Sequence, residues 1–394
     1  MASYPKEHSR RWLCCGRFPP PRDGQSIATQ ELVELLAPDI TFTCLNSTAR
    51  PPEGRIIPPG RLRIQRVREM LRYLSTLRSF MTRHPSPILY AIFSGSWPGH
   101  LRDCAAFAWA IPPQCPVVAW PHNSLQTLTS SAVGRQTLGW IARRIRSFVI
   151  AGPSLSKPLQ GIVPQDRIAI IPNLIARALL CSREEVEQKL ARLPSSPLRL
   201  LFVGHMMPEK GGWRLLEAIA LLQAAGIPCQ ATYVGGWSSP ADATSFAERV
   251  RILGLQERVH HHGLVSNPAM LRELYLTHHL MVLPTDHPLE AQPISIIEAL
   301  NAGCAVVSTP RGSIPDVVCS GVHGFLTDPS PEAIATAIAR YWHEPGLWQA
   351  HARAARSQFE SNFSPEIIRQ RWLQLLLEVE AEYRRFQHAN MKGW

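Results

Sequence analysis

The sequence predicts an α/β protein of two Rossmann-like domains that face each other across a cleft. At 394 residues, the chain exceeds the usual size of a single hydrophobic core. Short apolar segments alternate with helical patterns in both halves, which is typical of parallel sheets with crossover helices. A polar stretch that ends in Pro-Ser-Ser-Pro, residues 194–197, separates the halves.

The apolar segments give the expected strands. In the first half they are 11–15, 88–93, 117–120, 148–151 and 168–171, with a helix at 26–36. In the second half they are 199–203, 230–234, 259–262, 280–283 and 305–308. We expect a first domain at 1–176, a hinge at 177–197, a second domain at 198–364, and a C-terminal helix at 365–394 packing back on the first domain. Ligands of such sheets bind at the carboxyl ends of the strands.

Composition restricts the function classes. A hydrophobic content of 45% with 18% charged residues describes a folded chain. The net charge of +11 favours an anionic partner, although nearly all the basic residues are arginines. No apolar run approaches the roughly 20 residues of a membrane-spanning helix, and the nine cysteines lack metal-type spacing. We therefore expect a cytoplasmic protein with reduced thiols, no signal peptide, and at most peripheral contact with the inner face of a membrane.

The segment 200–212, LLFVGHMMPEKGG, carries the first chemical pattern. A strand ends at Gly204, and Lys210 with two glycines opens a helix. Glycine allows close backbone approach, a helix N-terminus favours anions, and lysine adds a positive charge, so the segment is suited to a phosphate. An ordinary strand–turn–helix with a surface lysine is the alternative on this segment alone.

The segment 283–309 carries the second pattern. Glu290 is expected in a loop, and Glu298 about a turn and a half into a helix that begins near Pro293. Both carboxylates can face one pocket, and carboxylates accept hydrogen bonds from sugar hydroxyls well. The spacing alone favours a purely structural interpretation. In it, Glu290 is an acidic residue near a helix N-terminus, where the helix dipole favours negative charge, and Glu298 is solvated.

In this order, the two segments resemble the family 4 group of retaining GT-B glycosyltransferases (glycosyl transferases group 1), in particular its polysaccharide-assembly branch. PEKGG matches the lysine–glycine element, and Glu290 with Glu298 matches the Glu-x7-Glu element. The further matches are EAQPISIIEA and GVHGFL (321–326) in the second half, and PPPRDGQSIAT (19–29), VVAWPHNS (117–124) and IIPN (170–173) in the first. Several motifs in the right order make the resemblance specific over most of the chain.

The resemblance implies a role for each matching position. Lys210 would neutralise the diphosphate of a nucleotide sugar, Glu290 would bind a hydroxyl of the transferred sugar, and His122 would lie beside the reacting sugar. Glu298 would hold the ribose hydroxyls. The implied donor-binding residues are Gly204, His205, Lys210, Gly263, Val265, Glu290, Gln292, Pro293, Ile294 and Glu298. Gly24, Gln25 and Ser26 would contact phosphate or acceptor.

The resemblance also implies the co-substrates. The donor would be a UDP- or GDP-sugar, and the acceptor a glycan or a lipid-linked intermediate of surface polysaccharide synthesis. No cofactor and no metal would be required, since protein groups carry the positive charge.

Two positions depart from the family pattern. His205 stands where a second phosphate-binding arginine is common, and a histidine is only partly charged near neutral pH. Arg311 and Arg102 are the candidates to replace that arginine. Ala291 replaces the usual glycine after the first glutamate. A non-catalytic or weakly active partner that binds nucleotide sugar therefore remains an alternative. So does a GT-B epimerase, although it would lack the paired glutamates.

Two other patterns are not interpreted as catalytic. Neighbouring side chains in a strand point to opposite faces, so His260, His261 and His262 cannot converge on a metal ion. Residues 61–83 form a basic amphipathic helix, whose simplest role is to cover its own sheet. Contact with an anionic membrane surface through Arg61–Arg83 is the alternative. No nucleic-acid partner is expected.

Overall fold

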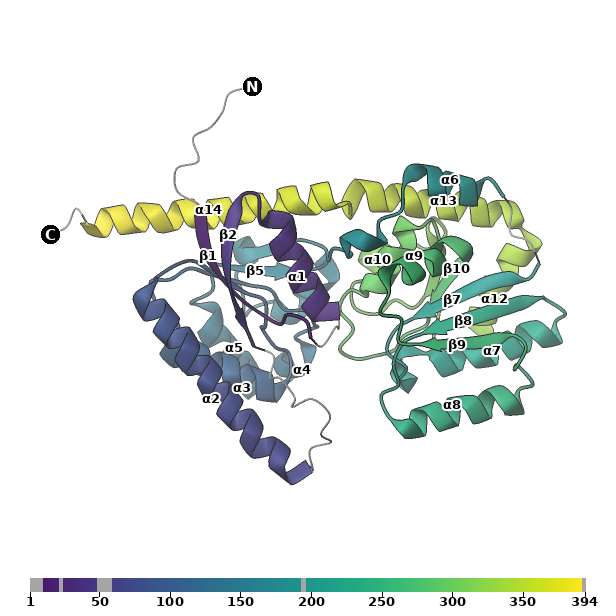
Figure 1. The fold of residues 1–394 in the computed structure, drawn as a ribbon, viewed down its shortest axis with the longest axis horizontal. Helices are drawn as coiled ribbons and strands as arrows, with labels where there is room; N and C mark the ends of the chain where they lie inside the picture. The colour runs from purple at the N-terminus through teal and green to yellow at the C-terminus, as the bar shows by residue number, and fades with distance from the viewer. Residues whose placement is uncertain (1–9, 21–23, 48–58, 193–195, 392–394) are drawn as a thin grey trace, which may run out of the picture. The chain divides into compact units, whose positions relative to one another are not determined.

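The computed structural model describes residues 10–20, 24–47, 59–192 and 196–391, and it divides into two compact units (Figure 1). Unit 1 comprises Met1–Pro172 together with Ile368–Trp394, and unit 2 comprises Asn173–Ile367. Each unit holds one six-stranded sheet in which all paired strands are parallel.

The sheet of unit 1 has the order β2-β1-β3-β4-β5-β6. Its strands are β1 (Arg10–Gly16), β2 (Ile40–Asn46), β3 (Ile88–Tyr90), β4 (Val117–Ala119), β5 (Ser147–Ile150) and β6 (Ile168–Ile170). The chain moves to one side of β1 to form β2 and to the other to form β3. The sheet therefore reverses direction between β1 and β3, where doubly wound folds place their ligand.

Helices cover both faces of this sheet. They are α1 (Gly24–Leu36), α2 (Pro59–Arg83), α3 (Trp97–Ala105), α4 (Gln126–Thr129) and α5 (Ala132–Ala142), with a π-helical turn at Ala106–Ala110 continuing α3. Leu74, Leu77 and Met81 of α2 pack with Phe107 and Leu138 in the core of this unit. Because both faces are covered, the central strands are apolar throughout and do not alternate.

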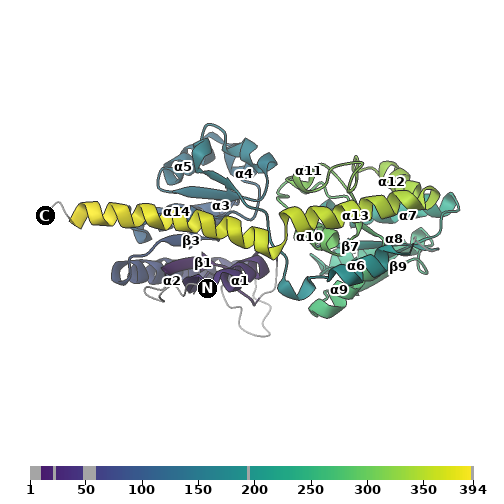
Figure 2. The same ribbon diagram turned by 90° about the horizontal axis from the view of Figure 1, so that it is seen from above.

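The last helix, α14 (Pro365–Met391), returns to unit 1 (Figure 2). Its Trp372 is fully buried, with its ring 5.1 Å from that of Trp120 just after β4. Near its other end, Glu382 accepts two hydrogen bonds of 2.5 Å from Arg146. The expectation of a C-terminal helix that packs back on the first domain is confirmed.

The sheet of unit 2 has the order β12-β11-β10-β7-β8-β9. Its strands are β7 (Leu198–Val203), β8 (Cys229–Val234), β9 (Val259–Gly263), β10 (Leu280–Leu283), β11 (Ala305–Ser308) and β12 (Gly324–Leu326). Numbered from β7, this is the strand order of the dinucleotide-binding fold. Here the direction of winding reverses between β7 and β10.

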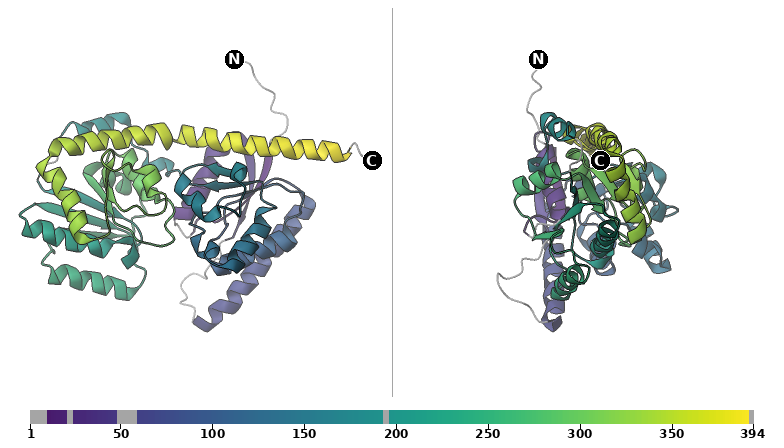
Figure 3. Two further views of the ribbon diagram at one scale, coloured as in Figure 1. Left: turned by 180° about the vertical axis from the view of Figure 1, so that it is seen from behind. Right: turned by 90° about the vertical axis from the view of Figure 1, so that its right-hand side faces the viewer.

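Two layers of helices enclose the second sheet (Figures 1 and 3). One face carries α7 (Gly212–Ala224), α8 (Pro240–Ile252) and α12 (Pro331–His343), of which α7 contacts the other two. The other carries α6 (Arg183–Leu190), α9 (Pro268–Thr277), α10 (Ile294–Asn301) and α13 (Pro345–Asn362). A short helix, α11 (Ile314–Val317), follows β11.

The structure differs from the sequence prediction at three places. Strands β2 and β12 were not expected, and β12 lies in the GVHGFL segment that matches the family. The described part of the predicted hinge, 177–197, belongs to unit 2, and Val186 and Leu190 of α6 are buried in the core of that unit. A capping box between Ser182 and Glu185 begins that helix.

Candidate active site

The reversal point of the second sheet brings together the two segments with the chemical patterns. Lys210 follows β7, and Glu290 lies in the loop after β10. Because β7 and β10 are adjacent parallel strands, both loops leave the same edge of the sheet. Asp286 N donates to Glu209 O at 2.9 Å and so ties one loop to the other.

Two glycines allow these loops to approach so closely. Gly211 has φ +85°, and a Cβ there would lie 2.2 Å from the carbonyl oxygen of Pro284. Gly312, after β11, has φ +53°, and a Cβ there would lie 2.4 Å from the backbone oxygens of Glu290 and Ala291. No other residue type fits either position without displacing the backbone. Gly211 also caps the N-terminus of α7, next to Lys210.

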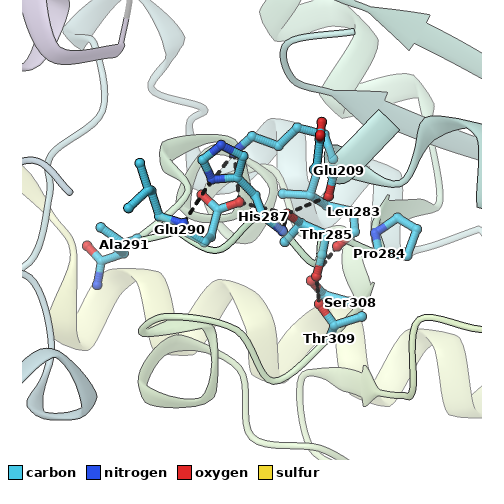
Figure 4. A network of polar contacts seen from close by, with 12 residues as sticks. Glu209, Leu283, Pro284, Thr285, His287, Glu290, Ala291, Ser308 and Thr309 are labelled. Atoms are coloured by element: carbon cyan, nitrogen blue, oxygen red, sulfur yellow. Dashed lines mark hydrogen bonds and ion pairs between the residues drawn. The ribbon is translucent and has the colours of Figure 1, made fainter. Parts of the chain in front are cut away.

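Lys210 and Glu290 form a short ion pair at the centre of this site. The Nζ of Lys210 lies 2.7 Å from Oε2 and 2.9 Å from Oε1 of Glu290. The carboxylate is 7% exposed and the lysine side chain 19%. Thr285 Oγ1 donates a third hydrogen bond, of 2.9 Å, to Oε2. Figure 4 shows the network of the loop after β10, in which Glu290 and Thr285 lie side by side.

Glu298 has a different environment, in the second turn of α10. Tyr275 of α9 donates a 2.6 Å hydrogen bond from its hydroxyl to Oε2. Burial raises the pKa of Glu298 to about 7, and the hydrogen bond from Tyr275 offsets part of that rise. The carboxyl group therefore changes its charge near neutral pH.

The other predicted donor residues of unit 2 lie at strand ends or beside Glu290. Gly204 directly follows β7 and the exposed His205 comes next, while Gly263 ends β9 shortly before Val265. Pro293 and Ile294 begin α10. Gln292 is buried and accepts a 2.7 Å hydrogen bond from Asn173 N, so its side-chain oxygen is engaged by the backbone.

Arg311 and Arg102, the candidates to replace the phosphate-binding arginine that is absent at position 205, have different surroundings. Arg102, in unit 1, is bound to the buried Asp103 at 2.7 Å and to Ile92 O at 2.5 Å. The guanidinium group of Arg102 is therefore already engaged by partners within unit 1. Arg311 is exposed and lies after β11, one residue before the glycine that packs on Glu290. Within the described ranges, Arg311 has no ion pair with an acidic residue, so its charge remains available to a ligand.

In unit 1 the predicted residues also lie at the carboxyl ends of strands. Gly24, Gln25 and Ser26 form the first turn of α1, just after β1. Gln25 Nε2 donates to Ala91 O at 2.9 Å, across the reversal point between β1 and β3. Residues 21–23 of the predicted loop lie outside the described residues.

His122 follows β4, with its ring 4.1 Å from that of Trp120. Burial, with a smaller contribution from the positive charge of Arg17, lowers the pKa of His122 to about 3, so the imidazole is neutral. Its Nε2 is buried without a hydrogen-bond partner in the described part of the chain. A ligand polar group would satisfy that atom.

The three consecutive histidines of β9 are divided between the two faces of the sheet. The rings of His260 and His262 lie 4.3 Å apart, whereas that of His261 packs 4.5 Å from Trp237. Across the described residues, no group of three or more histidine, cysteine or acidic side chains is placed to hold a metal ion.

Sequence reasoning missed two residues of the site, Thr285 and Tyr275. Both act on the predicted glutamates, Thr285 on Glu290 and Tyr275 on Glu298. Thr285 stands five residues before Glu290, in the segment 283–309 that carries the second chemical pattern. Its position in that segment could therefore have indicated a place in the site. Tyr275 is 23 residues from Glu298, and no local pattern connects the two.

One known protein family matches most of the second unit. Residues 183–358 match the family model of the glycosyl transferases group 1. Over 168 residues the chain is 31% identical to TuaC of Bacillus subtilis, a putative teichuronic acid biosynthesis glycosyltransferase. It is 27% identical over 205 residues to AmsK, an amylovoran biosynthesis glycosyltransferase of Erwinia amylovora.

These curated matches are partial. The alignment with TuaC covers 43% of this chain and 38% of TuaC, and that with AmsK covers 49% and 48%. The chain thus spans about half or less of the length of these relatives.

Solved structures resemble the chain over nearly its whole length. HepE of Anabaena, solved in complex with UDP and glucose, superposes with a TM-score of 0.69 at 16% identity and covers 94% of this chain and 100% of that one. Sucrose-phosphate synthase from Thermosynechococcus elongatus gives 0.73 at 18% identity, with coverage of 95% and 100%. At these identities the likeness shows the fold.

Two doubly wound units, each with one six-stranded parallel sheet, give the chain the GT-B fold of these solved structures. Residues 183–358 match the family model of the glycosyl transferases group 1, in agreement with the resemblance seen in the sequence.

The ion pair between Lys210 and Glu290 is expected to contribute to the stability of unit 2. Lys210→Ala leaves the carboxylate of Glu290 without its cation, and we expect the free energy of unfolding of unit 2 to fall by about 2 kcal/mol, measured by chemical denaturation. The control is Arg251→Ala, whose partner Glu248 is 51% exposed and which should cause no measurable change. Equal effects of the two substitutions would contradict the importance of the buried pair.

Proposed function

We propose that this protein is a retaining glycosyltransferase that moves a sugar from a UDP- or GDP-sugar to a glycan or lipid-linked acceptor in surface polysaccharide synthesis. The observation that carries the proposal is the Lys210–Glu290 pair, with α7 beginning beside it, at the reversal point of the second sheet. The named activities of TuaC and AmsK support the pathway class.

The proposed chemistry follows from the charges of the site. A departing nucleoside diphosphate gains negative charge, which Lys210, Arg311 and the N-terminal amides of α7 would stabilise. Glu290 would accept a hydrogen bond from the sugar, and Glu298 from the ribose. His122, being neutral, would serve as a hydrogen-bonding group and not as a cation. This set of positive groups is the reason that no metal enters the proposal.

The second candidate is a nucleotide-sugar-binding protein with little or no transfer activity. The observation that favours it is His205, which stands in place of a permanent positive charge. The epimerase alternative accounts less well for the paired glutamates.

One set of measurements separates these candidates. Melting temperature is first followed with UDP, GDP, ADP and their sugars, because a ligand that binds the native state raises it. Release of nucleoside diphosphate from the stabilising donor is then assayed, and NMR of the product gives its anomeric configuration. Binding without turnover supports the second candidate, and inversion of configuration contradicts the retaining assignment.

We expect Glu290→Gln and Lys210→Ala each to lower turnover by at least about a hundredfold, since each removes a group that contacts the reacting donor. Arg311→Ala should reduce it less. Arg251→Ala, far along α8, should leave turnover unchanged, as should an excess of chelator. Undiminished turnover in the first two variants would contradict the site assignment.

We expect donor binding to depend on pH through the charge of Glu298. Its carboxyl is protonated below its pKa of about 7, and accepting both ribose hydroxyls requires the carboxylate. Donor affinity should therefore rise with pH through about 7, and binding below that pH should release a proton. Calorimetry in buffers of different ionisation enthalpy measures the proton, and an intact nucleotide sugar adds no ionisation of its own. Glu298→Gln should remove the step, and a step that persists in this variant would contradict the assignment.

We further propose that α2 contacts an anionic membrane surface, where lipid-linked acceptors reside. No helix within the described ranges is long and apolar enough to span a bilayer. Tyr73, Leu74, Leu77 and Met81 of α2 are buried, which agrees with a helix that covers its own sheet. In contrast, the apolar residues Val67 and Leu71, closer to the N-terminus of α2, are 50% and 56% exposed. Arginines 68 and 72 adjoin them and would meet the lipid phosphates.

Sedimentation with vesicles tests this contact. The protein should bind vesicles of anionic lipid in a salt-sensitive way, and Val67→Glu with Leu71→Glu should weaken that binding. Ile252→Glu, at an exposed apolar residue of unit 2, is the control. Binding that is absent, or equal in all variants, would contradict the role of α2.

A further inference from the structure

Thr285 occupies a central place in the site, although neither the family pattern quoted above nor the spacing of the glutamates assigns it a role. It lies two residues after β10, and its side chain is completely buried. The hydroxyl group has one proton to donate, and its nearest acceptor is Glu290 Oε2 at 2.9 Å, against 3.3 Å for Glu209 O. The shorter contact to the charged acceptor is the stronger hydrogen bond.

The position of this hydroxyl is fixed from several sides. His287 N donates to Thr285 Oγ1 at 3.2 Å, and the hydroxyl of Thr309, after β11, donates to the carbonyl oxygen of Thr285. Figure 4 shows these contacts together with Glu290. Because the side chain is β-branched, its χ1 angle is restricted as well. The hydroxyl therefore acts as a rigid donor toward the carboxylate.

The acceptor capacity of the carboxylate is the next step. A carboxylate offers about four lone-pair sites, two on each oxygen. Oε2 accepts from both Lys210 and Thr285, and is filled. Among the described residues, Oε1 accepts from Lys210 only, at 2.9 Å. One acceptor site is left, and it lies on Oε1.

We propose that Thr285 is a positioning residue that determines donor specificity by directing Glu290 Oε1, and only Oε1, to a single hydroxyl of the transferred sugar. This inference rests on the proposed function. Without the threonine hydroxyl, the carboxylate could rotate about its last bond, and Oε2 would compete for the same sugar.

The test compares binding of the intact nucleotide sugar with binding of the nucleoside diphosphate alone. Thr285→Val keeps the shape and removes the donor. It should weaken binding of the nucleotide sugar by roughly ten- to a hundredfold and leave binding of the nucleoside diphosphate within about twofold. Thr285→Ser should restore most of the affinity. Ser308→Ala is the matched control, since Ser308 is equally buried at this edge and bonds Leu283 O without touching Glu290.

A double-variant cycle separates this role from a merely structural one. In the Glu290→Gln background, Thr285→Val should cause no further loss of nucleotide-sugar affinity, because the threonine acts through the carboxylate. Full additivity, or an equal loss of nucleoside diphosphate affinity, would overturn the proposal. Unchanged affinity in Thr285→Val would overturn it too.

Wild-type protein provides a test that needs no threonine variant. Among donors that each lack one sugar hydroxyl, a single one should show a loss of affinity that disappears in Glu290→Gln. Two such donors would overturn the restriction to one hydroxyl. If the wild type binds no nucleotide sugar at all, the proposed function itself fails, and the inference fails with it.

Discussion

The site of unit 2 depends on one interaction, the ion pair that Lys210 forms with Glu290. The pair joins the loops after two adjacent strands, and its carboxylate is almost fully removed from solvent. A charge in such a place requires a partner and further hydrogen bonds, which the lysine and Thr285 supply together. The close approach of the loops, and hence the glycines at 211 and 312, follows from this requirement.

The second glutamate shows how far environment alone can change a carboxyl group. Glu298 has no cation beside it in the described part of the chain, only the hydroxyl of Tyr275 and apolar surroundings. Burial without a counter-charge favours its neutral form, whereas Glu290 is neutralised by a lysine. Two residues of one type, eight positions apart, thus have different electrostatic properties.

Much of this arrangement could be predicted from the sequence, for identifiable reasons. Most of the buried parallel strands are continuous apolar runs, and ten of the twelve strands were expected at or near their observed bounds, although β9, with its three histidines, is not such a run. Strand β2 escaped because four of its residues are exposed or polar, and β12 because it has three residues and begins with glycine. Lys210 and Glu290 were predicted together because a motif connects them. Their direct contact could not be predicted, since it depends on the pairing of β7 with β10.

The helix α14 has a consequence for how the chain reaches its native state. Unit 1 is discontinuous, because its first 172 residues are completed only by the last 27. All of unit 2 is synthesised in between and can fold before α14 leaves the ribosome. Until then Trp120 lacks the partner ring of Trp372, and an apolar surface of unit 1 stays uncovered. A chain that stops before α14 therefore leaves that surface of unit 1 exposed to solvent, although every strand of both sheets described here has already been made.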